Sequence, residues 1–228
     1  MVGNVEFSAS MMCANYGNLE NEIKMLEEAG ISSFHIDIMD GQYVPNFGMG
    51  LQDLEYIKKI ATKPVEVHLM IKEPSRYLDI FIERKVDVIY FHPESDYHPT
   101  IIIEKLRKAG IEPGIVINPG TSVESVRELL YIVNKVMVMG VNPGNAGQVY
   151  LSYAGRKIED LLKMKSQYNY EVYWDGSCGI DKIVTYAPMG VKGFVLGTKM
   201  LFGHKESYAE RLNIARNSIN GHMESDKK

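Results

Sequence analysis

The sequence is poor in cysteine and tryptophan, with two cysteines and one tryptophan among 228 residues. Cys13 and Cys178 lie far apart in the chain and lack CxxC spacing, which argues against a disulfide framework or a zinc knuckle and indicates reduced thiols. No apolar run approaches about 18 residues, and the first residues lack a basic segment followed by an apolar core. We therefore expect a cytoplasmic protein without a membrane partner.

The sequence also lacks a strong charge of either sign, because its formal net charge is −4. Such a balance gives no general attraction for nucleic acid, so we expect no nucleic-acid partner, and any anionic ligand must be bound by local geometry. No linker divides the chain. The 45% of hydrophobic and 24% of charged residues are ordinary for a folded domain.

What the sequence does contain is an alternation of strand-like and helix-like segments. One amphipathic segment places Leu19, Ile23 and Leu26 on one face and ends at Gly30, and another helix is predicted to begin at Thr121. Eight apolar, β-branched or aromatic runs precede or separate such segments, at residues 5–10, 34–39, 65–70, 86–92, 113–118, 135–140, 170–175 and 193–197.

This alternation predicts an α/β fold, a single (β/α)8 TIM barrel over residues 1–220. A polar tail at residues 221–228 is expected to be disordered. Thr121 should cap its helix in a capping box with Glu124. A doubly wound open sheet is the alternative fold, and it ranks lower because no early GxGxxG follows the first strand.

Four residues able to bind a metal, His35, Asp37, His68 and Asp175, fall at the carboxyl ends of three predicted strands. Period-two alternation places His35 and Asp37 on one face of their strand, toward the mouth of the barrel. A lone histidine on a strand is usually a packed core or rim residue. Two carboxylates buried side by side, however, need a cation or a proton to compensate them. The coincidence of four such groups predicts a site for one divalent metal ion.

Three late loops are rich in glycine and small polar residues, at positions 142–147, 176–177 and 197–199. In parallel barrels, loops after strands seven and eight commonly bind phosphate through backbone amides. Tight turns also need glycine, so each loop alone is ambiguous, but the three together favour a phosphorylated ligand. Gly144 and Gly147 could serve as hinges of a lid.

Three methionines, Met39, Met70 and Met139, lie at strand ends. They could form an apolar wall near a reacting carbon, and core packing is an equally good interpretation. Trp174 is expected to face the helix layer.

Seven motifs occur in order along the chain: SMMCAN, HIDIMDGQYVPN, VHLM, FHPES, VNPGNAGQ, WDGSCG and GTKMLF. Together they resemble the motifs of the ribulose-phosphate 3-epimerase family of (β/α)8 barrels. The match is collinear from about Phe7 to Phe202. Its details are closer to the D-allulose 6-phosphate 3-epimerase branch than to the pentose phosphate enzymes.

The resemblance implies an isomerase that inverts C3 of a ketose phosphate by two-base proton transfer through a cis-enediolate. Asp37 and Asp175 match the catalytic acid/base residues, and with His35 and His68 they match the metal ligands. The enediolate would be stabilised by one divalent ion. Zn²⁺ is expected first, while Mn²⁺, Fe²⁺ and Co²⁺ are also compatible with such ligands. No organic cofactor is expected.

The resemblance and the glycine-rich loops together imply a set of substrate contacts, to which the loops add Lys199. It comprises Ser10, His68, Gly144, Asn145, Ala146, Gly147, Asp175, Gly176, Ser177, Gly197, Thr198 and Lys199. Four positions depart from the family pattern without removing a metal ligand or catalytic carboxylate. Asn145 replaces a Phe, Gly140 a Ser or Thr, Tyr173 a Glu, and Ala9 a Pro.

We expect D-allulose 6-phosphate, which would become D-fructose 6-phosphate, as the substrate. D-ribulose 5-phosphate, which would become D-xylulose 5-phosphate, is the close alternative. A non-catalytic barrel that binds sugar phosphates is an alternative of another class. A decarboxylase of the same architecture is disfavoured because the third strand lacks an Asp-x-Lys-x-x-Asp arrangement. The resemblance further suggests a homodimer or a larger homo-oligomer.

Overall fold

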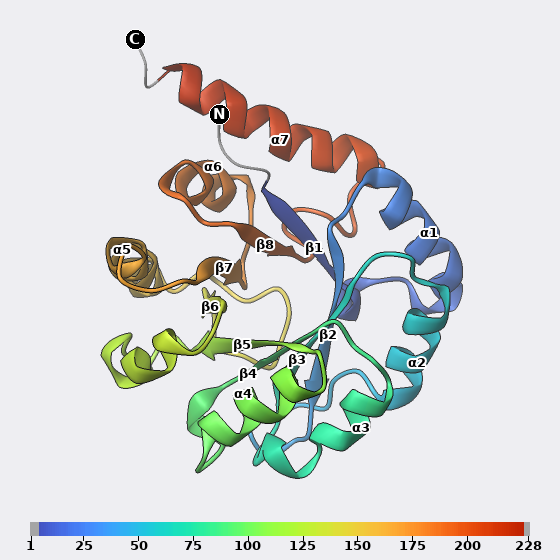
Figure 1. Ribbon diagram of the computed structural model, residues 1–228. Coiled ribbons are helices and arrows are strands. Elements are labelled where there is room, and N and C mark those ends of the chain that lie inside the picture. Colours follow the sequence, from blue (N-terminus) through green and yellow to red (C-terminus); the bar gives the residue numbers. More distant parts are fainter. Residues whose placement is uncertain (1–4, 226–228) are drawn as a thin grey trace.

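Eight parallel strands form a closed barrel at the centre of the molecule (Figure 1). The computed structural model describes residues 5–225, the last three of these by their backbone alone. Each strand pairs with its neighbours in chain order. The strands are β1 (Glu6–Ser10), β2 (Ser33–Met39), β3 (Val65–Met70), β4 (Val88–Phe91), β5 (Glu112–Ile117), β6 (Lys135–Met139), β7 (Glu171–Asp175) and β8 (Gly193–Leu196).

Pairing of the first strand with the last distinguishes the barrel from an open sheet. In the β1–β8 ladder, Phe7 lies opposite Phe194, and Ala9 lies opposite Leu196. The predicted single (β/α)8 barrel is therefore confirmed. The doubly wound alternative is wrong, because an open sheet would leave both of these strands at an edge.

Helices surround the sheet, as Figure 1 shows, and the glycine expected to end the first of them does so. Gly30 has φ +84°, and its N–H bonds to carbonyls of the last turn of α1. The helices are α1 (Leu19–Ala29), α2 (Leu51–Ile60), α3 (Leu78–Glu83), α4 (Pro99–Lys108), α5 (Gly155–Met164), α6 (Ile180–Met189) and α7 (Tyr208–Ser225). Short 3-10 helices are η1 (Met11–Cys13), η2 (Tyr16–Asn18), η3 (Pro74–Arg76), η4 (Pro93–Ser95), η5 (Glu124–Tyr131) and η6 (Ser152–Ala154).

The segment between β5 and β6 differs from the prediction. It forms the 3-10 helix η5 instead of an α-helix, and the capping box of Thr121 and Glu124 is absent. The Thr121 hydroxyl donates instead to Glu94 at 3.0 Å, and the Ser122 hydroxyl accepts from the N–H of Ser125. Thr121 and Glu124 have the spacing of a capping box, but the Thr121 hydroxyl bonds to Glu94 in the loop after β4 and is not available to cap the helix.

The side chains of the strands separate into two layers, as the alternation predicts. Ile36 and Trp174 pack outward, and the Trp174 ring lies 5.0 Å from that of Tyr186 on α6. Inside the barrel, the rings of Tyr90 and Tyr173 meet edge to face at 6.1 Å. The interior is therefore filled below the mouth, and chemistry is restricted to the carboxyl ends of the strands.

The end of the chain also departs from the prediction. Helix α7 continues to Ser225, so the backbone of residues 221–225 is helical where disorder was expected, because the polar segment extends a helix that is packed against α1 and α6. Residues 226–228 of the predicted tail lie outside those described. Within residues 5–225, no helix combines the length and apolarity needed to span a bilayer.

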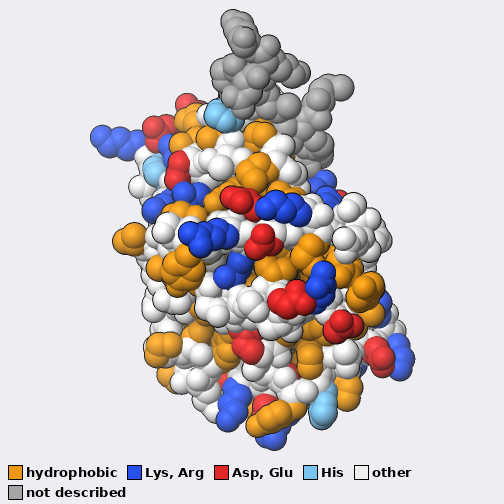
Figure 2. All heavy atoms as spheres, turned by 90° about the vertical axis from the view of Figure 1, so that its left-hand side faces the viewer, with side chains coloured by type: hydrophobic (Ala, Val, Ile, Leu, Met, Phe, Trp, Pro, Cys, Tyr) orange, Lys and Arg blue, Asp and Glu red, His pale blue; other side chains and the backbone are white. Residues whose placement is uncertain are grey.

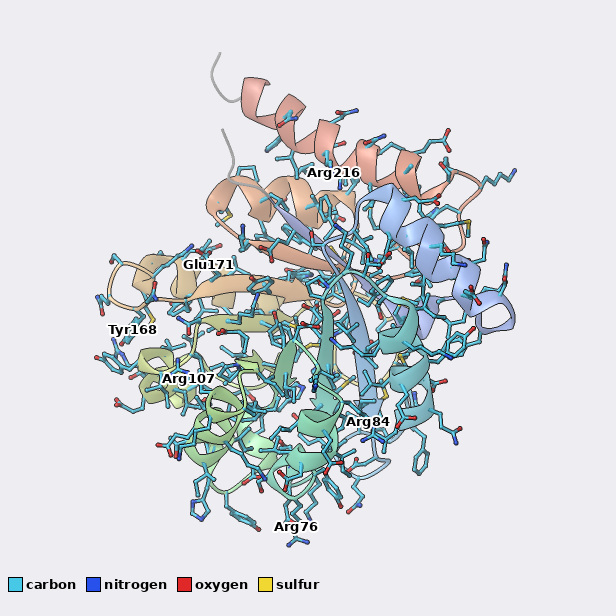
Figure 3. The ribbon with its side chains drawn as sticks, turned by 45° about the vertical axis from the view of Figure 1, so that its right-hand side comes forward. Arg76, Arg84, Arg107, Tyr168, Glu171 and Arg216 are labelled. Carbon is cyan, nitrogen blue, oxygen red and sulfur yellow. The ribbon has the colours of Figure 1, made fainter. Side chains whose placement is uncertain are left out.

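One face of the molecule shows the mixed charge expected from the composition (Figure 2). Figure 2 shows acidic, basic and apolar side chains interspersed over one face of the molecule, without an extended field of one sign. In Figure 3 the labelled arginines, among them Arg107 on α4 and Arg216 on α7, lie in the helix layer around the barrel.

Candidate active site and metal centre

Four side chains from three strands converge at the carboxyl end of the barrel. They are His35 and Asp37 on β2, His68 on β3 and Asp175 on β7, and one ligand atom from each lies within 4.8 Å of all the others. Register explains this convergence, because Asp37 lies opposite His68 in the β2–β3 ladder. Barrel closure then brings β7 near β2, although β8 and β1 separate them in the sheet.

The two imidazoles each direct one nitrogen toward the carboxylates. Nε2 of His35 lies 3.4 Å from Asp37 Oδ1 and 3.9 Å from Asp175 Oδ2. Nδ1 of His68 lies 3.3 Å from the same Asp37 oxygen and 3.7 Å from the same Asp175 oxygen. Both nitrogens are buried without a hydrogen-bond partner.

This donor set fits a divalent metal ion. Buried polar atoms are rarely left without partners, and here the two unpartnered nitrogens face the two carboxylate oxygens. Two imidazole nitrogens and two carboxylate oxygens suit Zn²⁺ and neighbouring transition metals. Burial of two carboxylates within one cluster is also unfavourable until positive charge compensates them.

The opposite nitrogen of each imidazole is held by a group that the sequence analysis did not single out. Nδ1 of His35 lies 2.8 Å from Glu66 Oε1, and Nε2 of His68 lies 2.9 Å from Nε2 of His92. Glu66 lies two residues before His68 on β3. The same alternation that grouped His68 with Met70 could therefore have found it. His92 directly follows β4, so it too lies at the carboxyl end of a strand.

Burial and neighbouring charges shift the pKa values of these groups in different directions. Burial opposes the charged form of His35, but the Asp37 and Glu66 carboxylates outweigh it and raise the His35 pKa well above its usual value. Burial likewise opposes ionisation of Asp37, yet His35 and His68 outweigh it and hold the pKa of that carboxyl below its usual range. At Asp175 burial prevails and the pKa is raised.

A pocket opens directly above the two carboxylates. Both Asp37 and Asp175 line it, and the Ser10 hydroxyl, also in the lining, donates to Asp37 Oδ2 at 3.0 Å. All three predicted wall methionines, Met39, Met70 and Met139, line the same pocket, joined by Met12. Met12 lies within a motif quoted for the family resemblance, but its position gave no period-two signal because it belongs to the 3-10 helix η1.

The three glycine-rich loops supply the rest of the lining, with two exceptions to the predicted substrate contacts. Gly147 lies outside the pocket, and His68 is fully buried and reaches the cluster from behind without lining the pocket. His68 is covered because its ring packs between those of His35 and His92. The predicted loop residues that do line the pocket are Gly144, Asn145, Ala146, Gly176, Ser177, Gly197, Thr198 and Lys199.

The loop after β7 has features of a binding site for an anion. Ser177 has φ +51°, an uncommon conformation for a residue with a side chain, and its hydroxyl is buried without a partner. Among the described residues that line the pocket, Lys199 carries the one cationic side chain. An unpartnered hydroxyl and a lysine at this end suit an anionic group such as a phosphate.

Two loops meet over the mouth. The side-chain amide of Asn46, between β2 and α2, donates to the Gly144 carbonyl at 2.7 Å and to Asn145 Oδ1 at 3.0 Å. Gln148 donates to the carbonyls of Asn142 and Asn145, within the loop that follows β6. Asn145, which replaces a Phe in the family pattern, thus takes part in a polar contact between the loops.

The replacement at Gly140 also has a structural reason. A Cβ at this position would lie 2.4 Å from the Trp174 ring and 2.6 Å from the Gly176 carbonyl. The N–H of Gly140 donates to the Asp175 carbonyl at 2.6 Å. Glycine therefore allows the end of β6 to pack closely against the strand that carries Asp175.

A closed parallel barrel with such a pocket and donor set at its carboxyl end belongs to the class of TIM-barrel enzymes. The model of the ribulose-phosphate 3 epimerase family matches residues 6–201. This chain belongs to that family, and it is accordingly an epimerase, a kind of isomerase.

Curated relatives agree with this assignment. Ribulose-phosphate 3-epimerase of Methanocaldococcus jannaschii is 36% identical over 190 residues, which cover 82% of this chain and 79% of the relative. The protein of the same name from Synechocystis is 30% identical over 222 residues and covers 96% of both chains. The names of these relatives support ketose-phosphate 3-epimerase activity, and a small sugar phosphate is a substrate that fits the family.

Solved structures with low sequence identity support the fold. 3-Keto-L-gulonate-6-phosphate decarboxylase from Vibrio cholerae has a TM-score of 0.72 at 9% identity and covers 96% of this chain and 99% of its own. Phosphoribosyl anthranilate isomerase from Thermotoga maritima has a TM-score of 0.66 at 8% identity and covers 95% and 99%. At such identities the likeness concerns the barrel alone.

Proposed function

We propose that this protein inverts C3 of a ketose phosphate, with Asp37 and Asp175 as the two acid/base groups. The observation that carries the proposal is the placement of these carboxylates. They come from separate strands, β2 and β7, yet line one pocket and converge on one cluster with two imidazoles. A substrate carbon between them would be accessible to a base on one side and an acid on the other.

His35, Asp37, His68 and Asp175 would hold one divalent cation, with Zn²⁺ as the first candidate. When bound, the cation supplies positive charge that stabilises the negative oxygens developing on the substrate. One aspartate removes the C3 proton, and the other returns a proton to the opposite face. Ser10 orients Asp37 through its hydrogen bond to Oδ2.

The remaining lining residues would bind and shield the sugar phosphate. The wall of Met12, Met39, Met70 and Met139 excludes water from the reacting carbon. Ser177 and Lys199 bind the phosphate at the other end, where backbone amides of the glycine-rich turns add further donors.

For the substrate, D-ribulose 5-phosphate has the stronger support. Two curated relatives that cover 82% and 96% of this chain carry the name ribulose-phosphate 3-epimerase. D-allulose 6-phosphate remains the second candidate, because His92-Pro93-Glu94 and Gly176-Ser177-Cys178 resemble the allulose branch. Cys178 lines the pocket. Glu94 lies on η4, which follows β4, and its carboxylate accepts a hydrogen bond from Thr121. The residues that resemble the allulose branch therefore lie at the carboxyl end of the barrel, as the site does.

Proton NMR in D2O would test the reaction and the substrate together. Metal-loaded protein is incubated with each ketose phosphate separately, and deuterium entry at C3 is followed as the epimer appears. Exchange with ribulose 5-phosphate preferred supports the first candidate, and preference for allulose 6-phosphate supports the second. Exchange with neither substrate would contradict the proposed reaction and favour a non-catalytic barrel that binds sugar phosphates.

A further inference from the structure

We propose that Glu66 and His92 are positioning residues that fix the tautomer and ring orientation of His35 and His68 and thereby set the affinity of the metal centre. The inference deepens the proposed function, on which it rests. Neither residue lines the pocket, and both are buried, with exposed fractions of 4% for Glu66 and 0% for His92. They act, therefore, through the two imidazoles and not on the substrate.

The ring of His35 is held by a carboxylate, that of Glu66. Glu66 accepts a hydrogen bond from Nδ1 of His35 at 2.8 Å, so Nδ1 keeps its proton and Nε2 is the nitrogen that would give its lone pair to a bound cation. A carboxylate behind a ligating imidazole also raises its basicity. Glu66 and His35 lie opposite each other in the β2–β3 ladder, so this orientation is fixed by strand pairing.

The ring of His68 is held by a second imidazole, that of His92, which is fully buried. Nε2 of His68 and Nε2 of His92 lie 2.9 Å apart, so one must donate and the other accept. Only donation by His68 leaves the lone pair of its Nδ1 directed at Asp37 and Asp175.

His92 itself is held in place on several sides. Its ring lies 4.9 Å from that of Tyr43 and 5.1 Å from that of His68. The Tyr43 hydroxyl accepts from Asn118, and the backbone carbonyl of His92 accepts from the Ser95 hydroxyl at 2.7 Å. His92 therefore connects the metal centre to a packed rim formed by the loops after β2, β4 and β5.

The test measures Zn²⁺ affinity by competition with a chromophoric chelator, using the full chain freed of metal. Three variants remove or replace the backing groups: Glu66→Gln, His92→Leu and His92→Gln. Glu66→Gln keeps the shape but removes the charge, and His92→Leu removes the acceptor. His92→Gln restores an acceptor as an amide oxygen. We expect affinity about 10- to 100-fold weaker for the first two, with partial recovery in His92→Gln.

Glu22→Gln is the matched control, because Glu22 is also a buried glutamate but lies on α1. Its exposed fraction is 7%, and it accepts a hydrogen bond from Tyr208 at 2.5 Å, away from the cluster. It should leave Zn²⁺ affinity unchanged. Thermal unfolding of every metal-free variant reports separately on folding.

The outcomes separate the inference from the proposed function. Weakening confined to the Glu66 and His92 variants supports the inference. Wild-type affinity in Glu66→Gln and His92→Leu, or equal weakening in Glu22→Gln, overturns it while the metal centre stands. Failure of the wild-type protein to bind Zn²⁺, Mn²⁺ or Co²⁺ contradicts the metal-dependent proposal itself.

Discussion

The two ends of the pocket are built in different ways. At the metal end the functional side chains lie on strands of the closed sheet, are mostly buried, and are backed by Glu66 and His92. At the other end the lining comes from loops, with Gly144 and Gly176 at positive φ and Ser177 in a strained turn. The difference indicates that strand pairing positions the ionisable side chains, while the loops supply the rest of the pocket lining.

The largest effect should come from the strand end. Replacing Asp37 or Asp175 by Asn removes an acid/base group, and we expect kcat to fall by about 10²- to 10⁴-fold for either variant. Deuterium exchange at C3 and epimer formation would be followed by NMR. Asp79→Asn, at an exposed site on α3, serves as the control. Near-normal turnover in either catalytic variant would remove the basis for two-base chemistry.

A second substitution tests the junction between the two ends. Gly140→Ala would place a methyl group against the Trp174 ring and the Gly176 carbonyl, so either the loop or the strand must shift. Overpacking of this kind costs about 1–3 kcal/mol in the free energy of unfolding, which urea denaturation measures. Gly120→Ala is the control, because no atom lies within 4 Å of its added Cβ. Equal free energies of unfolding for the two variants would show that the contact of residue 140 with Trp174 and Gly176 accommodates the methyl group without loss of stability.

At the loop end, Ser177→Ala should weaken substrate binding without preventing the chemistry. Losing a hydrogen bond between this hydroxyl and a charged phosphate costs about 1.5–3 kcal/mol, or an about 10- to 150-fold higher KM, with little change in kcat. Steady-state kinetics provides both constants. Ser218→Ala on α7 is the control. A drop in kcat at unchanged KM would place Ser177 with the reacting carbon instead of the phosphate.

The smallest effect is expected at the contact between loops. Asn46→Ala removes two hydrogen bonds to residues 144 and 145, and each neutral bond contributes about 0.5–1.5 kcal/mol. We expect a several-fold higher KM and faster amide exchange in the loop after β6. Gln42→Ala, an exposed position on the same loop as Asn46, is the control. Unchanged exchange would show that Asn46 does not restrain that loop.

Much of the strand end could be predicted from the sequence. The period-two pattern around His35 and Asp37 gave the inward face, and the outward Trp174 followed from the same alternation. The same alternation places Glu66 on the inward face of β3, but it does not predict that Glu66 contacts His35. The loops were less predictable than the strands, because Gly147 lies outside the pocket and Thr121, in the loop after β5, bonds to Glu94 instead of capping a helix. Loop contacts depend on partners far away in the chain, which no local pattern encodes.

By itself, the sequence determined the alternation of strands and helices, the family resemblance and the identity of the four converging residues, because periodicity and motifs are local properties of the chain. Only the tertiary structure decided which nitrogen of each histidine faces the carboxylates. It also revealed that Glu66 and His92 back the two rings and that Asn46 joins two loops across the mouth. Barrel closure fixes these relations, because it sets the distance between residues on separate strands and loops.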